Sequence, residues 1–448
     1  MAKVSNKNIF LCSECGNDYL KWHGKCPNCK KWGTLNEINI HSDSTRYSSN
    51  RYNLDVAPLS KFSKNFQSTK TFTAIPEFDR VLGGGIFTGA MILLGGSPGI
   101  GKSTLALQVA GSLDGSILYI SAEESLEQIG LRGKRLKIKE NNVSIISENR
   151  WELIEKQIIE LKPSYVIIDS IQTIFSEFND GHPGTISQVR ECGQKILDIC
   201  KSRYISVIII AHVTKEGIIA GPRMLEHMVD TILFLEGDSR NDYRLLRSYK
   251  NRFGATNEVG VFEMSGEGLK SVENPSKIFL SERQLNAPGS TVFPSMEGSR
   301  PILVEVQALV SNSSFSTPQR NVTGFDLNRL SMLVAVLEKR LNISVSADDI
   351  FINIVGGMNI NEPAADMAII AAIASSKKNV FINAETILLG EIGLSGELRS
   401  LNGIESRLKE SNRLGFKRAI VPKKGEKSIE GMKEIVCKTV SEAFDSIF

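Results

Sequence analysis

LLGGSPGIGKST, residues Leu93–Thr104, is the most informative stretch of this sequence. It contains a Gly-x-x-x-x-Gly-Lys-Ser string, which follows the apolar run MILL and precedes the apolar-periodic run LALQVAGSL. A strand, a glycine-rich loop and a helix in this order form a phosphate-binding loop, because backbone N–H groups and the helix N-terminus surround the phosphates. The residues expected to contact the nucleotide are Gly96, Ser97, Pro98, Gly99, Ile100, Gly101, Lys102, Ser103 and Thr104.

The side chains in and after this loop predict a nucleoside triphosphate bound with Mg²⁺. Lys102 would reach the β- and γ-phosphates, and the Ser103 hydroxyl would bind Mg²⁺. The later run YVIID ends in Asp169, and a carboxylate at the end of a buried strand completes the Mg²⁺ shell. Hydrolysis also needs a base that orients water, and YISAEES offers Glu123 and Glu124. Carboxylates also favour the start of a helix, so spacing alone leaves the choice of base open.

Short apolar runs alternate with helical stretches on both sides of the loop, from Thr71 to Gly268. The runs are nearly continuous in Ile, Val and Leu, which is typical of strands covered on both faces. The alternation predicts an α/β domain with a doubly wound parallel sheet. The expected strands are Met91–Gly96, Ser116–Ser121, Tyr165–Ser170, Ser206–Val213, Thr231–Gly237 and Tyr243–Tyr249.

Four of the seven cysteines lie near the N-terminus in two Cys-x-x-Cys pairs, CSEC and CPNC, with ten residues between them. Two such pairs offer four thiolates to one tetrahedral Zn²⁺, so the sequence predicts a zinc finger that the metal stabilises. The same segment carries Trp22 and Trp32 among several lysines. This basic, aromatic knuckle suits nucleic acid, a protein partner or a merely solvated face, and the sequence leaves the three open. The expected zinc ligands are Cys12, Cys15, Cys26 and Cys29.

Changes in composition divide the chain into four parts. We expect a zinc finger at 1–40, a polar, Ser-rich linker at 41–70, the ATPase domain at 71–272 and a third domain at 273–448. The third domain contains FDLNRLSMLVAVLEKRL, whose apolar residues recur at spacings of three and four, as on one helix face. That face would carry Leu327, Leu330, Val334, Leu337 and Leu341.

The bulk composition limits the partners and the compartment. The 448 residues carry a formal net charge of only +3, so any nucleic-acid-binding surface must be local. The N-terminus MAKVSNKNIF lacks the apolar centre of a secretory signal, and the most apolar run, Ile205–Val213, is too short to span a bilayer. We therefore expect a cytoplasmic protein with no membrane contact.

Four stretches together resemble the bacterial RadA/Sms family of DNA-recombination ATPases: GGSPGIGKST, YISAEES, AHVTKEGIIAGPRMLEHMVD and KNRFG. The resemblance covers nearly the whole chain and implies a RecA-like P-loop ATPase core. By position, it implies that Glu123 is the catalytic glutamate and that His212 senses the γ-phosphate. It also implies that Lys250 and Arg252 act on the neighbouring subunit's nucleotide, where a fixed positive charge stabilises the transferring phosphoryl group. The KNRFG signature consists of Lys250, Asn251, Arg252, Phe253 and Gly254.

The same resemblance implies a function in homologous recombination and DNA repair. We expect a DNA-dependent ATPase that forms a hexameric ring on single-stranded DNA and drives branch migration of branched intermediates, beside a RecA-type recombinase. The loops Glu177–Arg190 and Thr214–Arg223 would face the DNA, with Lys215 and Arg223 as the contacting cations. A nucleotide-switched scaffold that loads a recombinase without translocating is an alternative that the sequence leaves open.

The third domain resembles the α+β proteolytic domain of Lon. The Lon nucleophile lies in a Pro-Ser-Ala-Gly string, and the matching string EPAAD places Ala364 there. The Lon lysine follows Gly-Gly-Leu, and NGIES places Glu405 there. Alanine has no nucleophile and glutamate cannot replace the neutral amine base, so we expect an inactive domain rather than an ATP-dependent protease. Its cations suit assembly or DNA contact: Arg399, Arg407, Lys409, Arg413, Lys417, Arg418, Lys423 and Lys424.

Overall fold

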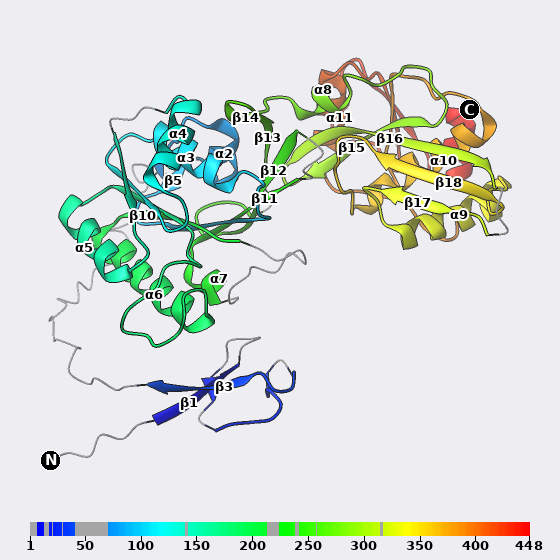
Figure 1. Cartoon of the computed structure of the whole chain (residues 1–448). Coiled ribbons are helices and arrows are strands. Elements are labelled where there is room, and N and C mark those ends of the chain that lie inside the picture. The colour runs from blue at the N-terminus through cyan, green and yellow to red at the C-terminus, as the bar shows by residue number, and fades with distance from the viewer. Residues whose placement is uncertain are drawn as a thin grey trace, which may run out of the picture. The chain divides into compact units, whose positions relative to one another are not determined.

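The structure is a computed structural model, traced in Figure 1. Its residues divide into two compact units: 1–236, 245–256 and 264–271 form one, and 237–244, 257–263 and 272–448 form the other. None of the helices in the described part of the chain combines the length and apolar character needed to cross a membrane. The described residues are 7–12, 18–19, 21–28, 30–40, 70–138, 142–212, 224–237, 242–256, 258–313 and 317–448.

The N-terminal segment folds as a small antiparallel ribbon of three strands. These are β1 (Lys7–Cys12), β2 (Asp18–Tyr19) and β3 (Leu35–Ile40), in the order β2-β1-β3. Its apolar cluster contains Cys12, Cys26 and Leu35, with Phe10 and Tyr19 packed against them. Two of the predicted zinc ligands therefore lie in the small core of this ribbon.

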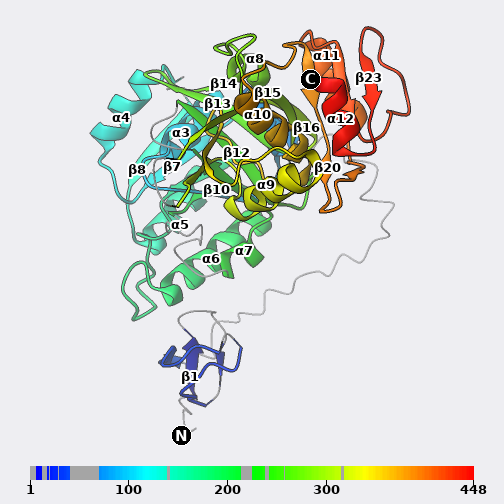
Figure 2. The ribbon, with the colours of Figure 1, turned by 90° about the vertical axis from the view of Figure 1, so that its right-hand side faces the viewer.

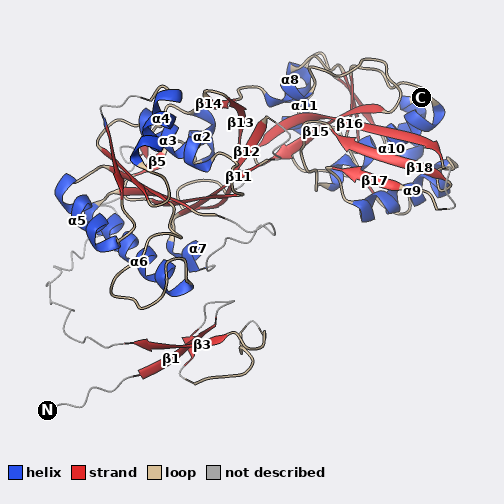
Figure 3. Cartoon of the chain, in the orientation of Figure 1, coloured by secondary structure: helices blue, strands red, loops and turns tan. Residues whose placement is uncertain are grey.

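A nine-stranded sheet forms the centre of the first unit, shown by its red strands in Figure 3. The order is β14-β13-β12-β11-β6-β10-β9-β7-β8, and the pairs from β11 to β8 are parallel. All six residues of β6 are buried, as its central place requires. The strands are β6 (Met91–Gly96), β7 (Ile117–Ser121), β8 (Val143–Ser147), β9 (Tyr165–Asp169), β10 (Ser206–Ile210), β11 (Thr231–Glu236), β12 (Tyr243–Asn251), β13 (Val259–Ser265) and β14 (Gly268–Ser271).

This sheet differs from the predicted one in the course of β12 and in three strands that were not expected, β8, β13 and β14. The expected strand Tyr243–Tyr249 continues to Asn251 and runs antiparallel to β11. Strand β8 was not expected, because at the edge of the sheet its residues are only partly buried and its apolar run is short. The sheet is therefore parallel around the phosphate loop and antiparallel where β12 joins β11.

Helices cover both faces of the parallel strands. Figures 1 and 2 show α3 and α4 on one side and α5, α6 and α7 on the other. Residues of α5 and α6 form one buried cluster with alternate residues of β6, β7, β9 and β10, as period-2 side chains require. The helices are α3 (Lys102–Ser112), α4 (Leu126–Arg135), α5 (Trp151–Leu161), α6 (Ile186–Arg203) and α7 (Met224–Met228). A short pair of strands, β4 (Lys70–Thr71) and β5 (Ile86–Phe87), flanks α2 (Pro76–Val81).

The second unit is built on a seven-stranded mixed sheet with the order β17-β18-β16-β15-β19-β22-β23. Helix α10 lies against β15 and β16, and ten of its thirteen residues are buried. The strands are β15 (Ser290–Glu297), β16 (Arg300–Asn312), β17 (Arg320–Thr323), β18 (Asp348–Ile354), β19 (Thr386–Leu388), β22 (Arg418–Val421) and β23 (Lys433–Val436), with β20 (Glu391–Ile392) and β21 (Leu398–Arg399) forming a separate pair.

The predicted amphipathic helix is α9, but its buried face differs from the expected one. The buried residues include Leu330, Val334 and Leu337 as expected, whereas Leu327, in the first turn, is 47% exposed. The helices of this unit are α8 (Pro275–Phe279), α9 (Leu327–Leu341), the 3₁₀ turn η3 (Pro363–Ala365), α10 (Asp366–Lys378), α11 (Ile404–Arg413) and α12 (Val440–Ile447).

Candidate functional site

The predicted phosphate loop connects the end of β6 to the start of α3. Gly96 has φ +152°, and a Cβ there would lie 2.6 Å from the carbonyl oxygen of Leu235 on the neighbouring strand. Gly101, the N-cap of α3, has φ +116°, and a Cβ there would lie 2.6 Å from the Met264 side chain. Both positions therefore require glycine for conformation and for space.

Lys102 lies at the first turn of α3 and is 4% exposed. Its Nζ donates to the carbonyl oxygens of Gly96, at 2.9 Å, and Ser97, at 3.0 Å. Burial lowers the pKa of Lys102, and the nearby carboxylates of Asp169 and Glu123 partly offset this. The loop's own carbonyls thus hold an ammonium group beside two acidic side chains, as phosphate binding requires.

Asp169 at the end of β9 is 8% exposed and accepts a hydrogen bond from the Tyr119 hydroxyl at 2.7 Å. Burial raises its pKa, while hydrogen bonds from Ser103 and Tyr119 act in the opposite direction. The fold thus brings Ser103 and Asp169 into contact, as predicted from two separate stretches. An alcohol and a carboxylate oxygen at one place are donors that suit a hard divalent cation.

The structure distinguishes the two glutamates that follow β7. Ser170 Oγ donates to Glu123 Oε1 at 2.6 Å, and His212 Nε2 lies 3.6 Å from the same oxygen. Glu124 instead forms an ion pair with Arg132, with 2.5 Å between Oε1 and Nη2. The Glu123 carboxylate therefore faces a hydroxyl and an imidazole, whereas a guanidinium neutralises Glu124.

These groups surround one cavity of about 320 Å³. Its lining includes two cations that the sequence analysis did not select, Arg132 and Arg135. They lie three residues apart on α4 and hence on one helix face, a spacing that could have identified them. The lining residues are Gly99, Gly101, Lys102, Ser103, Thr104, Ser121, Glu123, Glu124, Arg132, Arg135, Asp169 and His212. Four predicted loop residues do not line it: Gly96, Ser97, Pro98 and Ile100.

The KNRFG signature does not line this cavity. Lys250 Nζ donates to the carbonyl oxygens of Glu226, at 2.6 Å, and Val229, at 2.7 Å, near the end of α7. Arg252 lies 3.3 Å from Asp230, and its side chain is 54% exposed. Lys250 and Asn251 belong to β12 itself rather than to a turn after it.

The other three signature residues have local contacts. The Asn251 amide donates to the carbonyl oxygen of Leu82 at 3.2 Å. Phe253 stacks on Phe87 with ring centroids 4.2 Å apart. A Cβ at Gly254 would lie 3.2 Å from Leu82 O and 2.8 Å from the Asn251 side chain, so glycine allows the close approach. These residues hold the end of β12 against the turn after α2.

Strand register places the signature far from the phosphate loop of its own chain. Asn251 pairs with Thr231, and Thr231 pairs with Ile92 at the start of β6. Gly96, where the phosphate loop begins, is four residues further along β6. At about 3.3 Å per residue, the two ends are about 13 Å apart along the strand. The signature and the loop therefore lie at opposite ends of the strands of this sheet.

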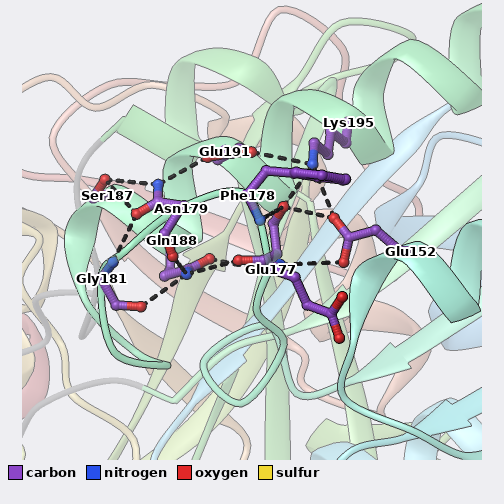
Figure 4. Close-up of polar contacts among 10 residues, drawn as sticks. Glu152, Glu177, Phe178, Asn179, Gly181, Ser187, Gln188, Glu191 and Lys195 are labelled. Atoms are coloured by element: carbon purple, nitrogen blue, oxygen red, sulfur yellow. Dashed lines mark hydrogen bonds and ion pairs between the residues drawn. The ribbon is translucent and has the colours of Figure 1, made fainter. Parts of the chain in front are cut away.

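The segment after β9 is a tightly hydrogen-bonded loop (Figure 4). The fully buried Gln188 donates through Nε2 to the carbonyl oxygens of Ser176, at 3.1 Å, Asn179, at 2.7 Å, and Gly181, at 2.8 Å. Its Oε1 accepts from the Ser176 N–H at 2.9 Å. One side chain of α6 therefore holds the first part of the expected DNA-facing loop Glu177–Arg190, whose last five residues belong to α6 itself. The other such loop, Thr214–Arg223 with Lys215 and Arg223, lies outside the described residues.

The ribbon holds two of the four predicted zinc ligands in hydrogen-bonded positions. Cys12 Sγ lies 3.2 Å from Thr34 Oγ1, and Cys26 Sγ lies 3.5 Å from the Tyr19 hydroxyl. Each of these sulfurs lies beside a hydroxyl group that can donate to a thiolate, as the outer contacts of a metal site do, so this environment fits zinc. Cys15 and Cys29 lie outside the described residues.

The second unit places an ion pair with a buried guanidinium between the two elements that the sequence analysis matched to the Lon catalytic residues. Ala364 in η3 is 2% exposed. Glu362, directly before η3, forms an ion pair with Arg407 of α11. Arg407 Nη2 lies 2.5 Å from Glu362 Oε2, and Arg407 is 3% exposed. Glu405 accepts from the Lys427 N–H at 3.2 Å. Arg407 is thus a buried structural residue and not part of the predicted basic surface.

Three protein-family models match separate parts of the chain. A rubredoxin metal-binding domain matches residues 10–37, KaiC matches 71–144, and subunit ChlI of Mg-chelatase matches 331–425. Together with the phosphate loop and its cavity, they define a RecA/KaiC-like P-loop ATPase with an N-terminal zinc ribbon and a C-terminal ChlI/Lon-like domain.

Curated relatives match along nearly the whole length. The chain is 47% identical over 430 residues to DNA repair protein RadA of Bacillus subtilis, covering 94% of this chain and 93% of that protein. It is 44% identical over 445 residues to DNA repair protein RadA of Aquifex aeolicus, covering 99% of each. The chain therefore belongs to the DNA repair protein RadA family. Among solved structures, a KaiC-like protein from Pyrococcus horikoshii OT3 is similar with a TM-score of 0.39 and 20% identity, over 45% of this chain and 98% of that one.

Proposed function

We propose that this chain is a DNA-dependent ATPase that moves along single-stranded DNA and drives branch migration of recombination intermediates. The observation that carries the proposal is the convergence of Lys102, Glu123, and the Ser103–Asp169 contact on one cavity. Membership of a DNA repair family indicates that DNA is the polymer on which the energy of hydrolysis acts. We propose that it works in the cytoplasm, together with a RecA-type recombinase.

Each side chain has a separate task in hydrolysis. When the nucleotide binds, the Lys102 ammonium exchanges its hydrogen bonds to the two loop carbonyls for contacts with the β- and γ-phosphate oxygens. Ser103 and Asp169 would hold Mg²⁺, which would supply positive charge beside the phosphates. Glu123, held by Ser170, orients the attacking water as the base, and His212 reports the γ-phosphate through the 3.6 Å contact with that carboxylate.

The signature is proposed to act on the neighbouring subunit of a hexameric ring. Support comes from its place at the opposite end of the strands, which keeps it away from its own phosphate loop. The half-exposed Arg252 guanidinium, held by one contact to Asp230, is available to a neighbouring nucleotide. Lys250 is turned toward backbone carbonyls of α7, and its proposed action in trans requires it to leave them.

The remaining parts are proposed to organise the assembly. The loop fixed by Gln188 would face the DNA in the ring, together with Lys215 and Arg223. Residues 1–40 form the zinc-binding part and 71–272 the motor. The part at 273–448 is proposed to be proteolytically inactive, because the buried Ala364 offers no nucleophile and the Arg407–Glu362 pair joins the elements beside it.

ATP turnover of the full chain, with and without single-stranded DNA, tests this proposal. We expect DNA to raise turnover, and we expect Lys102→Ala to abolish most of it because the phosphate charge is left uncompensated. Lys156→Ala, which removes an exposed cation of α5 outside the cavity, is the matched control and should retain the response. Turnover that DNA does not change, or that survives in Lys102→Ala, would contradict the proposal.

A further inference from the structure

The zinc ribbon exposes two of the three tryptophans of the chain. Trp22 is 60% exposed and Trp32 is 75% exposed, whereas Trp151 in α5 is fully buried. The apolar cluster of the ribbon is formed by smaller side chains and contains neither indole. Exposed tryptophans that contribute nothing to a core are a feature of binding surfaces.

The backbone brings these two indoles together over a glycine. Lys25 pairs with Trp32 in an antiparallel bridge, and the Gly33 N–H donates to the Gly24 carbonyl oxygen at 2.9 Å. A Cβ at Gly24 would lie 3.5 Å from Trp22 Cη2 and 3.6 Å from Trp32 Cζ3. The two rings are thus the nearest side chains to the space above Gly24 among the described residues.

The sequence segment that carries the tryptophan pair has charges of one sign. Residues 21–34 contain four lysines and no aspartate or glutamate, although the whole chain has a net charge of only +3. Lys25 Nζ lies 5.7 Å from the centre of the Trp32 ring, in cation–π geometry. The four lysines are Lys21, Lys25, Lys30 and Lys31.

We propose that Trp22 and Trp32 form a stacking platform for unpaired bases of single-stranded DNA, with the surrounding lysines contacting its phosphates. Every base offers a flat face to an indole, and a positive groove follows the backbone, so such a site binds single strands with little sequence preference. A duplex keeps its bases stacked and cannot use the rings. The uniform positive charge favours a polyanion over a mixed-charge protein surface. The inference deepens the proposed function, on which its choice of DNA rests.

Intrinsic fluorescence tests the platform without altering it. In full-length Trp151→Phe protein, Trp22 and Trp32 are the only tryptophans, and excitation selective for indole reports on them alone. Titration with oligo(dT) at low salt should quench them saturably, while the same length of double-stranded DNA should quench much less. Absence of quenching by the single strand would overturn the inference, and this measurement needs no substitution in the ribbon.

Substitution then measures how much the rings contribute to binding. Trp22→Ala with Trp32→Ala should weaken oligo(dT) binding by roughly tenfold or more, since each stacked base contributes measurably to affinity. Phe at both positions should restore much of it. Phe72→Ala, which removes a 70% exposed aromatic outside the ribbon, is the control and should bind normally. Bound zinc, measured in each variant, confirms that the ribbon is folded.

Two other results would overturn the inference. One is unchanged oligo(dT) affinity in the double alanine variant with its zinc retained. The other is loss of binding to a recombinase filament while affinity for naked single strand is normal, which would assign the tryptophan pair to a protein partner. Stimulation of ATP turnover by DNA tests the proposed function separately, because it can persist or fail whichever result the tryptophans give.

Discussion

Replacing Glu123 by Gln removes a negative charge from the cavity and leaves the side-chain size unchanged. The Ser170 hydroxyl can still donate to the remaining amide oxygen, so the position of the side chain should be kept. The neighbouring Glu124 provides a matched substitution, since it also lines the cavity but is paired with Arg132.

The structure gives different magnitudes for the two variants. A positioned general base contributes about 10²–10⁴-fold to rate, or about 3–5 kcal/mol of barrier. The Glu124–Arg132 side chains are 34% and 21% exposed, and a pair screened by solvent to this extent is worth about 1 kcal/mol at most. Glu123→Gln should therefore lose at least about a hundredfold in turnover, and Glu124→Gln no more than about fivefold.

Steady-state ATP turnover in the presence of single-stranded DNA measures both variants. Binding of a fluorescent ATP analogue is the control, and it should stay within a few-fold of the unsubstituted chain because the phosphate loop is intact. Equal losses in the two variants, or a Glu123→Gln protein with more than a tenth of normal turnover, would refute the assignment of the base.

Four further outcomes follow from other parts of the chain. Cys12→Ser should lose zinc, measured by elemental analysis, yet keep DNA-independent ATP turnover; native protein purified without zinc would contradict the zinc ribbon. Arg252→Ala should bind ATP within a few-fold but fail at branch migration, and mixing it with Lys102→Ala should restore part of the turnover through composite sites; mixtures that give only the sum of the two activities, although subunits exchange, would show that Arg252 acts locally. Arg407→Met should destabilise the third domain by about 3 kcal/mol in chemical denaturation because Glu362 is left without its cation, and a change below about 1 kcal/mol would show the pair to be dispensable. The chain should not cleave casein, and cleavage that disappears on a substitution in residues 273–448 would restore the protease alternative.

Local pattern was sufficient to predict where the glycine-rich loop and Asp169 lie in the fold. The strand–glycine–helix order fixes where Lys102 lies, and a carboxylate ending a buried strand fixes Asp169, because neighbouring parallel strands end at one edge. The contact between Ser103 and Asp169 follows from these two placements.

Features that depend on which strands or side chains pair with one another could not be predicted from the sequence. The antiparallel course of β12 follows from the short separation between Glu236 and Tyr243, which leaves no room for a crossover helix, and the apolar pattern alone did not reveal it. The choice between Glu123 and Glu124 depends on Arg132, a residue of the next helix. The sequence suggests that Arg407 is a surface cation, and only its burial against Glu362 reveals its structural role.

Whether hydrolysis moves the protein along DNA or only switches a scaffold is tested most directly by strand displacement on a branched three-strand substrate. The assay compares ATP with a non-hydrolysable analogue, and the unsubstituted chain with Glu123→Gln. A motor predicts displaced strand only with ATP and the unsubstituted chain, although DNA is bound under all four conditions. Displacement of the same strand at the same rate with the analogue, or by Glu123→Gln, would contradict translocation and favour a nucleotide-switched loader.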